Sequence, residues 1–189
     1  MARCYSGAMQ NRQSLPQLWL LSDARNDAGL EQALRRLPRG SGFVLRHYHL
    51  PPAQRRARFR ALARIARACG HTVVLSGSAA EARRWGADGA YGSARALGAG
   101  AAGLRLVTVH SLAELRRARR ADAVLLSPVF PTRSHPGAAG LGTLRFRAIA
   151  AWAPMPVIAL GGMDARRARQ LGWPRWAAID GLSATKRLG

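Results

Sequence analysis

The sequence contains few cysteines and no long apolar run. Its two cysteines, Cys4 and Cys69, form neither a disulfide framework nor the paired spacing of a zinc site. No apolar run approaches the roughly 20 residues that a membrane-spanning helix needs. The first residues, MARCYSGAMQNRQSLPQ, lack the apolar segment of a secretory signal. We therefore expect a cytoplasmic protein with no membrane partner, a flexible extension at residues 1–16 and a single domain over residues 17–189.

Acidic residues and lysine are also scarce, which leaves a formal net charge of +21. All but one of the 30 basic residues are arginine, and they recur along every predicted helix. A nucleic-acid-binding surface clusters its cationic side chains and interleaves aromatic ones. We therefore predict no specific nucleic-acid partner, and an RNA-associated protein that binds through charge alone is the last of our alternatives. The positive field attracts anionic substrates.

Short apolar runs alternate with amphipathic segments along the chain. Runs such as residues 123–126 are too short for a helix and are typical of buried strands, whereas residues 52–69 carry the apolar stripe of a helix. The predicted strands are residues 19–22, 42–50, 72–75, 88–91, 104–109, 123–126, 156–162 and 176–183, with a first helix at 27–37 and a loop at 92–103. This order predicts an α/β fold, a compact (β/α)8 TIM barrel. Few residues follow the last strand, so we expect a truncated last helix. We expect the apolar surface that this leaves exposed on the barrel to be covered by the N-terminal extension or by a second subunit, as in a homodimer.

The loop after residues 123–126 carries groups that suit a phosphate. Thr132 and Ser134 offer hydroxyls, Arg133 a guanidinium and His135 a titratable ring. In a parallel α/β protein the loops after the strands carry the chemistry. The alternative is a surface loop made of turn residues.

The next two predicted strands end at glycines. Gly161 and Gly162 close one of them, and Gly181, followed by Leu182, closes the other. Glycine lets an anion approach the backbone N–H groups, and the loops after strands seven and eight of a barrel commonly hold a phosphate. We therefore expect these four residues to bind phosphate through the backbone.

One arginine falls inside a predicted strand. Within residues 42–50, Val44, Arg46 and Tyr48 alternate onto one face. The inner face of a barrel opens onto the ligand site at the carboxyl ends of the strands, so we expect Arg46 to point there. The alternative is a strand-end charge that reaches solvent. We interpret His47 as a packing or surface residue and not as a metal ligand.

Three segments, SPVFPTRSHPGAAGLG, PVIALGG and VTVHSLAEL, resemble the family of thiamine phosphate synthase and thiazole tautomerase over residues 18–182. Pro128 stands where the tautomerase has its catalytic histidine, so the loop is of the synthase type. The resemblance implies transfer of an aminopyrimidine from its diphosphate to a thiazole phosphate, with release of pyrophosphate. It implies catalytic roles for Arg46, Thr108, Ser134 and His135. The residues that it implies as substrate-binding are Arg46, Thr132, Arg133, Ser134, Gly161, Gly162, Gly181 and Leu182.

The resemblance also implies Mg²⁺, but the acidic ligands of the family are absent from this chain. Ser76 and Gly77 replace one acidic segment, and Arg95 falls near the second acid of the other. Magnesium prefers carboxylate oxygens, so we assign no residue to a metal. Two readings rank ahead of the RNA alternative: a divergent synthase, or a degenerate relative that binds a thiazole phosphate or thiamine phosphate without turnover.

Overall fold

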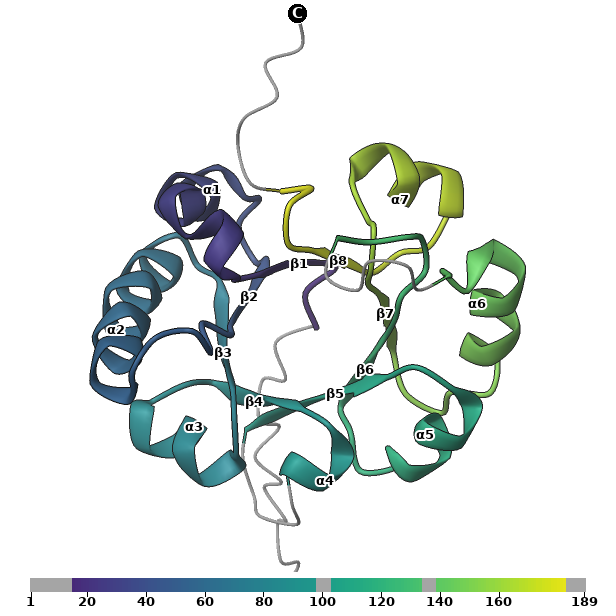
Figure 1. Ribbon diagram of the computed structural model, residues 1–189, viewed down its shortest axis with the longest axis horizontal. Coiled ribbons are helices and arrows are strands. Elements are labelled where there is room, and N and C mark those ends of the chain that lie inside the picture. The colour runs from purple at the N-terminus through teal and green to yellow at the C-terminus, as the bar shows by residue number, and fades with distance from the viewer. Residues whose placement is uncertain (1–14, 98–102, 134–138, 183–189) are drawn as a thin grey trace, which may run out of the picture.

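In the computed structural model, which describes residues 15–97, 103–133 and 139–182, eight parallel strands form a closed barrel (Figure 1). The strands follow chain order around the ring, and β1 closes it by pairing with β8, where Leu20 lies opposite Ala178. The strands are β1 (Leu18–Leu21), β2 (Gly42–Leu45), β3 (Thr72–Ser76), β4 (Gly89–Gly92), β5 (Leu104–Val109), β6 (Ala123–Leu126), β7 (Val157–Ala159) and β8 (Trp176–Ala178). The predicted barrel is confirmed.

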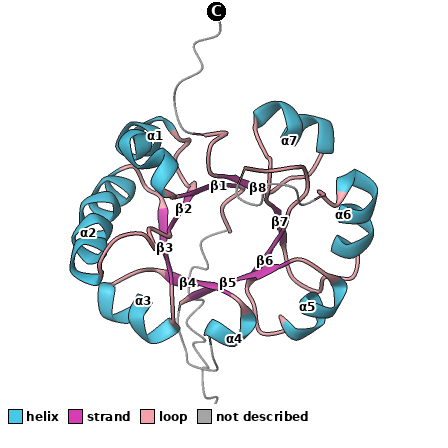
Figure 2. Cartoon of the chain, viewed as in Figure 1, coloured by secondary structure: helices cyan, strands magenta, loops and turns pink. Residues whose placement is uncertain are grey.

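Helices surround the barrel as an outer layer (Figure 2). They are the 3-10 helix η1 (Ala24–Gly29) and the α-helices α1 (Leu30–Arg36), α2 (Pro52–Ala68), α3 (Ala79–Trp85), α4 (Ala94–Leu97), α5 (Leu112–Arg117), α6 (Gly142–Ala150) and α7 (Ala165–Leu171). The predicted truncated last helix would follow Leu182 and lies outside the described residues, as do residues 1–14 of the predicted N-terminal extension. Among the described residues no helix combines the length and the apolar character that would let it cross a membrane.

Alternate residues of the strands build two separate cores. Leu21, Val44, Leu125 and Ile158 are fully buried inside the barrel, whereas Phe43 and its outward-facing counterparts pack beneath the helices. These side chains fill the barrel, so a ligand can enter only where the strands end. Active sites of this architecture lie at the carboxyl ends of the strands. We call that end the mouth.

Strand β2 is shorter than predicted. It ends at Leu45, so Arg46 follows the strand instead of lying within it. The chain turns at His47, whose φ of 41° lies in the left-handed region. Such a backbone is unusual for a residue other than glycine and persists where side-chain contacts hold it. The predicted strands at 156–162 and 176–183 also end early, at Ala159 and Ala178.

Two helical segments differ from the prediction. Residues 27–37 were expected to form one helix capped by Asp27, but η1 precedes α1 and its cap is Asp23. The Asp23 side chain accepts from the backbone N–H of Arg25 and so satisfies a donor that the helix leaves open. In the predicted loop at 92–103, the single-turn helix α4 forms.

Candidate active site

Polar residues from the ends of the first five strands gather at the mouth. Asp23 and Arg46 follow β1 and β2, Ser76 ends β3, and Tyr91 and Thr108 lie near the ends of β4 and β5. In their strands they continue the inward-facing series that includes Leu21, Val44 and Leu106. The inward orientation predicted for Arg46 therefore follows from the strand pleat, and Thr108 shares that orientation.

The guanidinium of Arg46 lies beside a carboxylate and an aromatic ring. Its Nη1 is 3.9 Å from Oδ2 of Asp23, and its Cζ lies 5.7 Å from the ring centre of Tyr48. The side chain is 24% exposed, so it is half-buried at the mouth and still reachable by a ligand. In the parts of the chain that the structure describes, no backbone or side-chain acceptor takes a hydrogen bond from this guanidinium.

A buried chain of hydrogen bonds fixes the backbone at Arg46. Its N–H donates to the Ser22 hydroxyl at 2.7 Å, and Ser22 Oγ lies 2.7 Å from His47 Nδ1. His47 Nε2 lies 2.8 Å from Asp27 Oδ1, which also accepts from Arg58 Nε at 2.8 Å. Because the Ser22 oxygen already accepts from Arg46, its proton points at Nδ1, so neutral His47 donates from Nε2 to Asp27.

The electrostatics of this chain keep His47 neutral. Burial lowers the pKa of His47 below its ordinary value, although the hydrogen bond to Asp27 opposes the shift. Burial raises the pKa of Asp27, but the hydrogen bonds from His47 and Arg58 outweigh it and hold that pKa below the ordinary value. Serine, histidine and aspartate are also the groups of a hydrolytic triad. Here Ser22 is fully buried, so the three hold the backbone and do not act as a nucleophile and its base.

Tyr48 and Arg55 cover the side of the mouth at β2 and β3. The Tyr48 hydroxyl contacts the Ser76 hydroxyl, and its ring lies between the guanidiniums of Arg46 and Arg55. Arg55, from α2, donates to the Arg46 carbonyl at 2.8 Å and to the Ser76 carbonyl, and it pairs with Glu81 at 3.4 Å. Its donors are therefore taken by the protein, and its role is to hold the loops after β2 and β3.

Tyr91 and Thr108 are hydrogen-bonded to each other on the adjoining strands β4 and β5. Burial raises the pKa of the Tyr91 phenol, and the hydrogen bond with Thr108 only partly offsets this effect. The phenol therefore stays protonated near neutral pH. The sequence indicated Thr108, whereas Tyr91 went unnoticed, although its inward position in β4 was readable from alternation.

The loops after β6, β7 and β8 pack against one another through the predicted glycines. A Cβ on Gly161 would lie 2.6 Å from Pro128 Cα, and one on Gly162 would lie 2.6 Å from the Pro131 carbonyl oxygen. A Cβ on Gly181 would collide with the Met163 carbonyl. Gly161 and Gly162 also have φ values of 94° and 62°, which L side chains rarely adopt. The glycines thus allow the three loops to pack against one another. The sequence alone did not indicate this steric role.

The close packing brings the predicted phosphate-binding residues of this half together. Thr132 follows Pro131 beside Gly162, and Gly181 lies one loop farther along the rim. Within the described ranges, the N–H groups of Gly162 and Gly181 donate to no protein acceptor. Arg133 is exposed, and Leu182 turns its side chain onto the outer core. The remaining candidates, Ser134 and His135, lie outside the described residues.

Ion pairs join the two halves of the rim. Arg25 Nε donates to Asp23 Oδ1 at 2.8 Å, and Arg25 Nη1 lies 3.4 Å from Asp180 Oδ2, next to Gly181. Asp23 in turn lies beside Arg46. Arg25 therefore links the part of the rim that carries Arg46 to the loop that carries Gly181.

The acidic side chains at the mouth do not fit a magnesium site. Asp23 and Asp27 each accept hydrogen bonds from arginine, and Glu81 pairs with Arg55. Among the described residues, no three histidine, cysteine, aspartate or glutamate side chains are grouped as metal ligands would be. Mg²⁺ requires oxygen ligands that are free to turn toward it.

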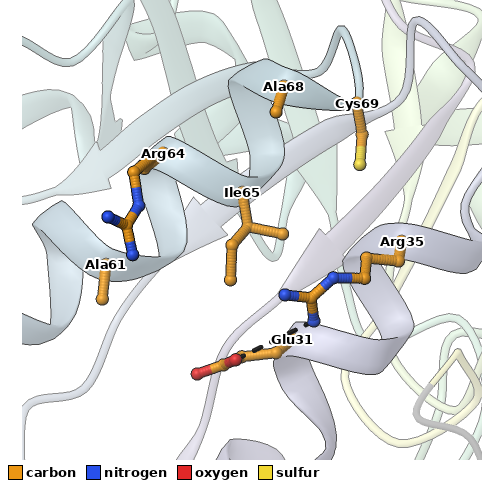
Figure 3. Close-up of a pocket in the computed structure, with 7 residues that line it drawn as sticks. All are labelled: Glu31, Arg35, Ala61, Arg64, Ile65, Ala68 and Cys69. Atoms are coloured by element: carbon orange, nitrogen blue, oxygen red, sulfur yellow. Dashed lines mark ion pairs between the residues drawn. The ribbon is translucent and has the colours of Figure 1, made fainter.

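A surface hollow of about 310 Å³ lies between α1 and α2, on the outer wall and away from the mouth (Figure 3). Glu31 and Arg35 from α1 form an ion pair of 3.8 Å there, and Ile65 and Cys69 from α2 line the opposite side. The arginines of this hollow face a glutamate and aliphatic side chains. Because no set of polar groups converges on it, we do not regard it as the active site.

The chain is similar in sequence and fold to proteins of one family. The family model described as thiamine monophosphate synthase matches residues 20–182. No curated protein sequence matches the chain.

Two solved structures of the same description share the fold. A thiamine phosphate pyrophosphorylase from Pyrococcus furiosus superposes with a TM-score of 0.76 at 22% identity, covering 92% of this chain and 91% of that one. A thiamine phosphate pyrophosphorylase from Bacteroides thetaiotaomicron gives a TM-score of 0.56 at 18% identity, with coverages of 86% and 82%. At these identities the superpositions establish the barrel, and the family rests on the sequence model.

Proposed function

Because the chain belongs to the thiamine monophosphate synthase family, we propose that it is a thiamine phosphate synthase-like transferase. The substrates would be an aminopyrimidine methyl diphosphate and a thiazole phosphate. The methylene C–O bond breaks and pyrophosphate leaves with the electron pair. The lone pair of the thiazole nitrogen then forms the new C–N bond, which gives thiamine phosphate. The observation that carries the proposal is a mouth with a half-buried arginine on one side and, on the other, backbone N–H groups left unused by the described residues, above an apolar floor.

In this proposal Arg46 stabilises the departing pyrophosphate. Charge develops on that group in the transition state, and a guanidinium offers paired donors in a fixed geometry. Arg46 is half-buried and has donors to give. Thr132 and Arg133 are assigned to the same group from the loop after β6, and Ser134 and His135, which lie outside the described residues, are assigned to it from the sequence alone.

The glycine half is assigned to the thiazole phosphate. Gly162 and Gly181 present backbone N–H groups that other protein groups leave unused in the described chain. Gly161 and Leu182 extend the same stretch of backbone. Amides held by loop packing bind an anion with little reorganisation.

The floor of the mouth protects a reactive carbocation from water. Val44, Leu125 and Ile158 are completely buried, and Leu160 is nearly so. Exclusion of water prevents hydrolysis of a cationic intermediate. We assign Thr108, held by Tyr91, to positioning of the pyrimidine over this floor.

A second candidate is a relative that binds a thiazole phosphate or thiamine phosphate without turnover. The observation that favours it is the pairing of Asp23, Asp27 and Glu81 with arginines, which removes the carboxylates that would hold a metal. In that case the glycine half retains its ligand while the pyrophosphate half has lost its catalytic partner.

Incubation of the full chain with both phosphorylated precursors tests the proposal. We expect thiamine phosphate and pyrophosphate in equal amounts, and we expect Arg46→Ala to lower kcat by about 10²-fold or more, as loss of a charge-stabilising donor does elsewhere. Arg35→Ala, which removes the same charge from the outer wall, is the matched control and should leave kcat unchanged. Ligand-induced thermal stabilisation with no product would instead support the second candidate.

A further inference from the structure

The carboxylates at the mouth are occupied by cationic side chains. Asp23 Oδ1 accepts from both the backbone and the side chain of Arg25, at 3.2 and 2.8 Å. Burial raises the pKa of Asp23, but these hydrogen bonds outweigh it and hold the pKa below its ordinary value. Asp27 Oδ1 is shared by His47 and Arg58. Each carboxylate thus already pairs with an arginine through Oδ1, and reorienting it so that both oxygens face a metal would break a charge-assisted hydrogen bond.

The carboxylate that reaches the loop after β3 is also occupied. Glu81 extends from α3 back to Gly77, where a Cβ would collide with its carboxylate. That carboxylate lies 3.4 Å from Arg55 Nη1, and Arg55 is held in place by two backbone carbonyls. The absence of a side chain at Gly77 thus leaves room for a third arginine–carboxylate pair, Arg55 with Glu81.

The arginines of this half fall into two groups. Arg55 and Arg58 use their donors on the protein: Arg58 donates to Asp27, to Glu31 and to the Asp27 carbonyl. Arg46 differs, because its nearest anion is Asp23 at 3.9 Å and, in the described chain, its guanidinium donates no hydrogen bond. A guanidinium with unused donors, only loosely paired with a carboxylate that Arg25 holds, can exchange that contact for a pair of phosphate oxygens.

We infer that the mouth captures a diphosphate through Arg46 without a divalent cation, and that Asp23 is the internal anion which the diphosphate displaces. The inference rests on the proposed function, because it names how the pyrophosphate half of that site works. It makes Asp23 a competitor of the ligand. A metal site would make the same residue indispensable.

The test is calorimetric titration of the full chain with inorganic pyrophosphate, in EDTA and in Mg²⁺. We expect binding in EDTA with an affinity within about threefold of that in Mg²⁺. Arg46→Ala should weaken it by about tenfold or more, as expected for loss of a bidentate charged pair, and Arg46→Lys should give an intermediate value. Arg35→Ala, the charge-matched control, should not change it. Binding that appears only with Mg²⁺, or no binding in either buffer, would overturn the inference.

Asp23→Asn separates the two roles most sharply. Asparagine is as good a helix cap as aspartate and still accepts from Arg25, so η1 should remain intact. Displacement predicts that the variant binds pyrophosphate about two- to fivefold more tightly, because a weak, partly exposed ion pair no longer competes. A loss of affinity in the folded variant would contradict it.

Product assays in both buffers distinguish this inference from the proposed function. Pyrophosphate binding only with Mg²⁺, together with thiamine phosphate formed in that buffer, would overturn the inference and leave the function standing. If pyrophosphate binds in EDTA but no product forms in either buffer, the result would support the inference and contradict the proposed transferase activity.

Discussion

The half of the mouth built by β1–β3 and the half built by β6–β8 would meet anions in different ways. The first presents side chains: Arg46 is aimed by the chain of Ser22, His47 and Asp27. The second presents backbone, because its loops touch where Gly162 and Gly181 carry no side chain. A side-chain site can change its charge by one substitution, whereas a backbone site depends on the path of the chain.

The largest expected effect breaks the backbone half. Gly162→Ala places a Cβ 2.6 Å from the Pro131 carbonyl oxygen at a φ of 62°. The collision and the left-handed backbone together should lower the free energy of unfolding by about 2–4 kcal/mol and displace the loop that carries Thr132. Urea denaturation measures the stability, and titration with a thiazole phosphate measures the site.

Gly86→Ala is the matched control for this substitution. Gly86 ends α3 at a φ of 74° and has open space where the Cβ would lie. Gly86→Ala should therefore lower the free energy of unfolding by only about 1 kcal/mol, the cost of a left-handed backbone at alanine, and leave ligand affinity unchanged. Equal losses in the two variants would show that the loop contacts at Gly162 contribute nothing.

The next effect tests the side-chain half through its pH dependence. Because the pKa of folded His47 lies below the ordinary 6.5, the unfolded chain binds its proton first as the pH falls. The contribution of neutral His47 to the free energy of unfolding is therefore fully present above about pH 6.5 and decreases as the pH falls below that value. A separate decline below pH 3.8 is expected from Asp23 and Asp27, whose folded pKa values are lowered.

Two variants of His47 separate titration from contact. His47→Gln can accept from Ser22 and donate to Asp27 without titrating, so the decline that begins near pH 6.5 should be reduced. His47→Ala removes both hydrogen bonds and leaves the buried Ser22 hydroxyl without its acceptor, so it should cost about 1–3 kcal/mol at every pH. Urea midpoints between pH 4.5 and 8 measure both variants, and an undiminished decline in His47→Gln would assign it to another group.

The barrel itself was predictable because burial in strands is a local pattern. The run at 123–126 matches β6 residue for residue, and the alternation of Val44 with Arg46 gave the right inner face although β2 ends before Arg46. Side chains still alternate one residue past the end of β2, at Arg46, because the backbone turns only at His47.

The contacts that organise the site were not predictable, because they join residues far apart in the chain. Ser22 and His47 are separated by 25 positions, and Arg55 reaches Glu81 from another helix. Nothing local marks such pairs. The steric need for Gly161 is equally invisible, since the Pro128 backbone that approaches it belongs to the preceding loop. Residue types therefore indicated an anion site, but which arginine is available for a ligand emerged only from the three-dimensional contacts.

The smallest effect refines the side-chain half at Tyr48, whose ring centre lies 5.7 and 5.6 Å from the guanidinium carbons of Arg46 and Arg55. Tyr48→Ala removes an exposed cation–π partner worth up to about 1 kcal/mol and should weaken pyrophosphate binding by about two- to fivefold, because Arg46 gains conformational freedom. Tyr48→Phe keeps the ring and loses only the hydroxyl that contacts Ser76, so its affinity should stay near that of the unmodified chain. If Tyr48→Phe is as weak as Tyr48→Ala, the hydroxyl and not the ring holds this side of the mouth, and Ser76→Ala should then reproduce the loss.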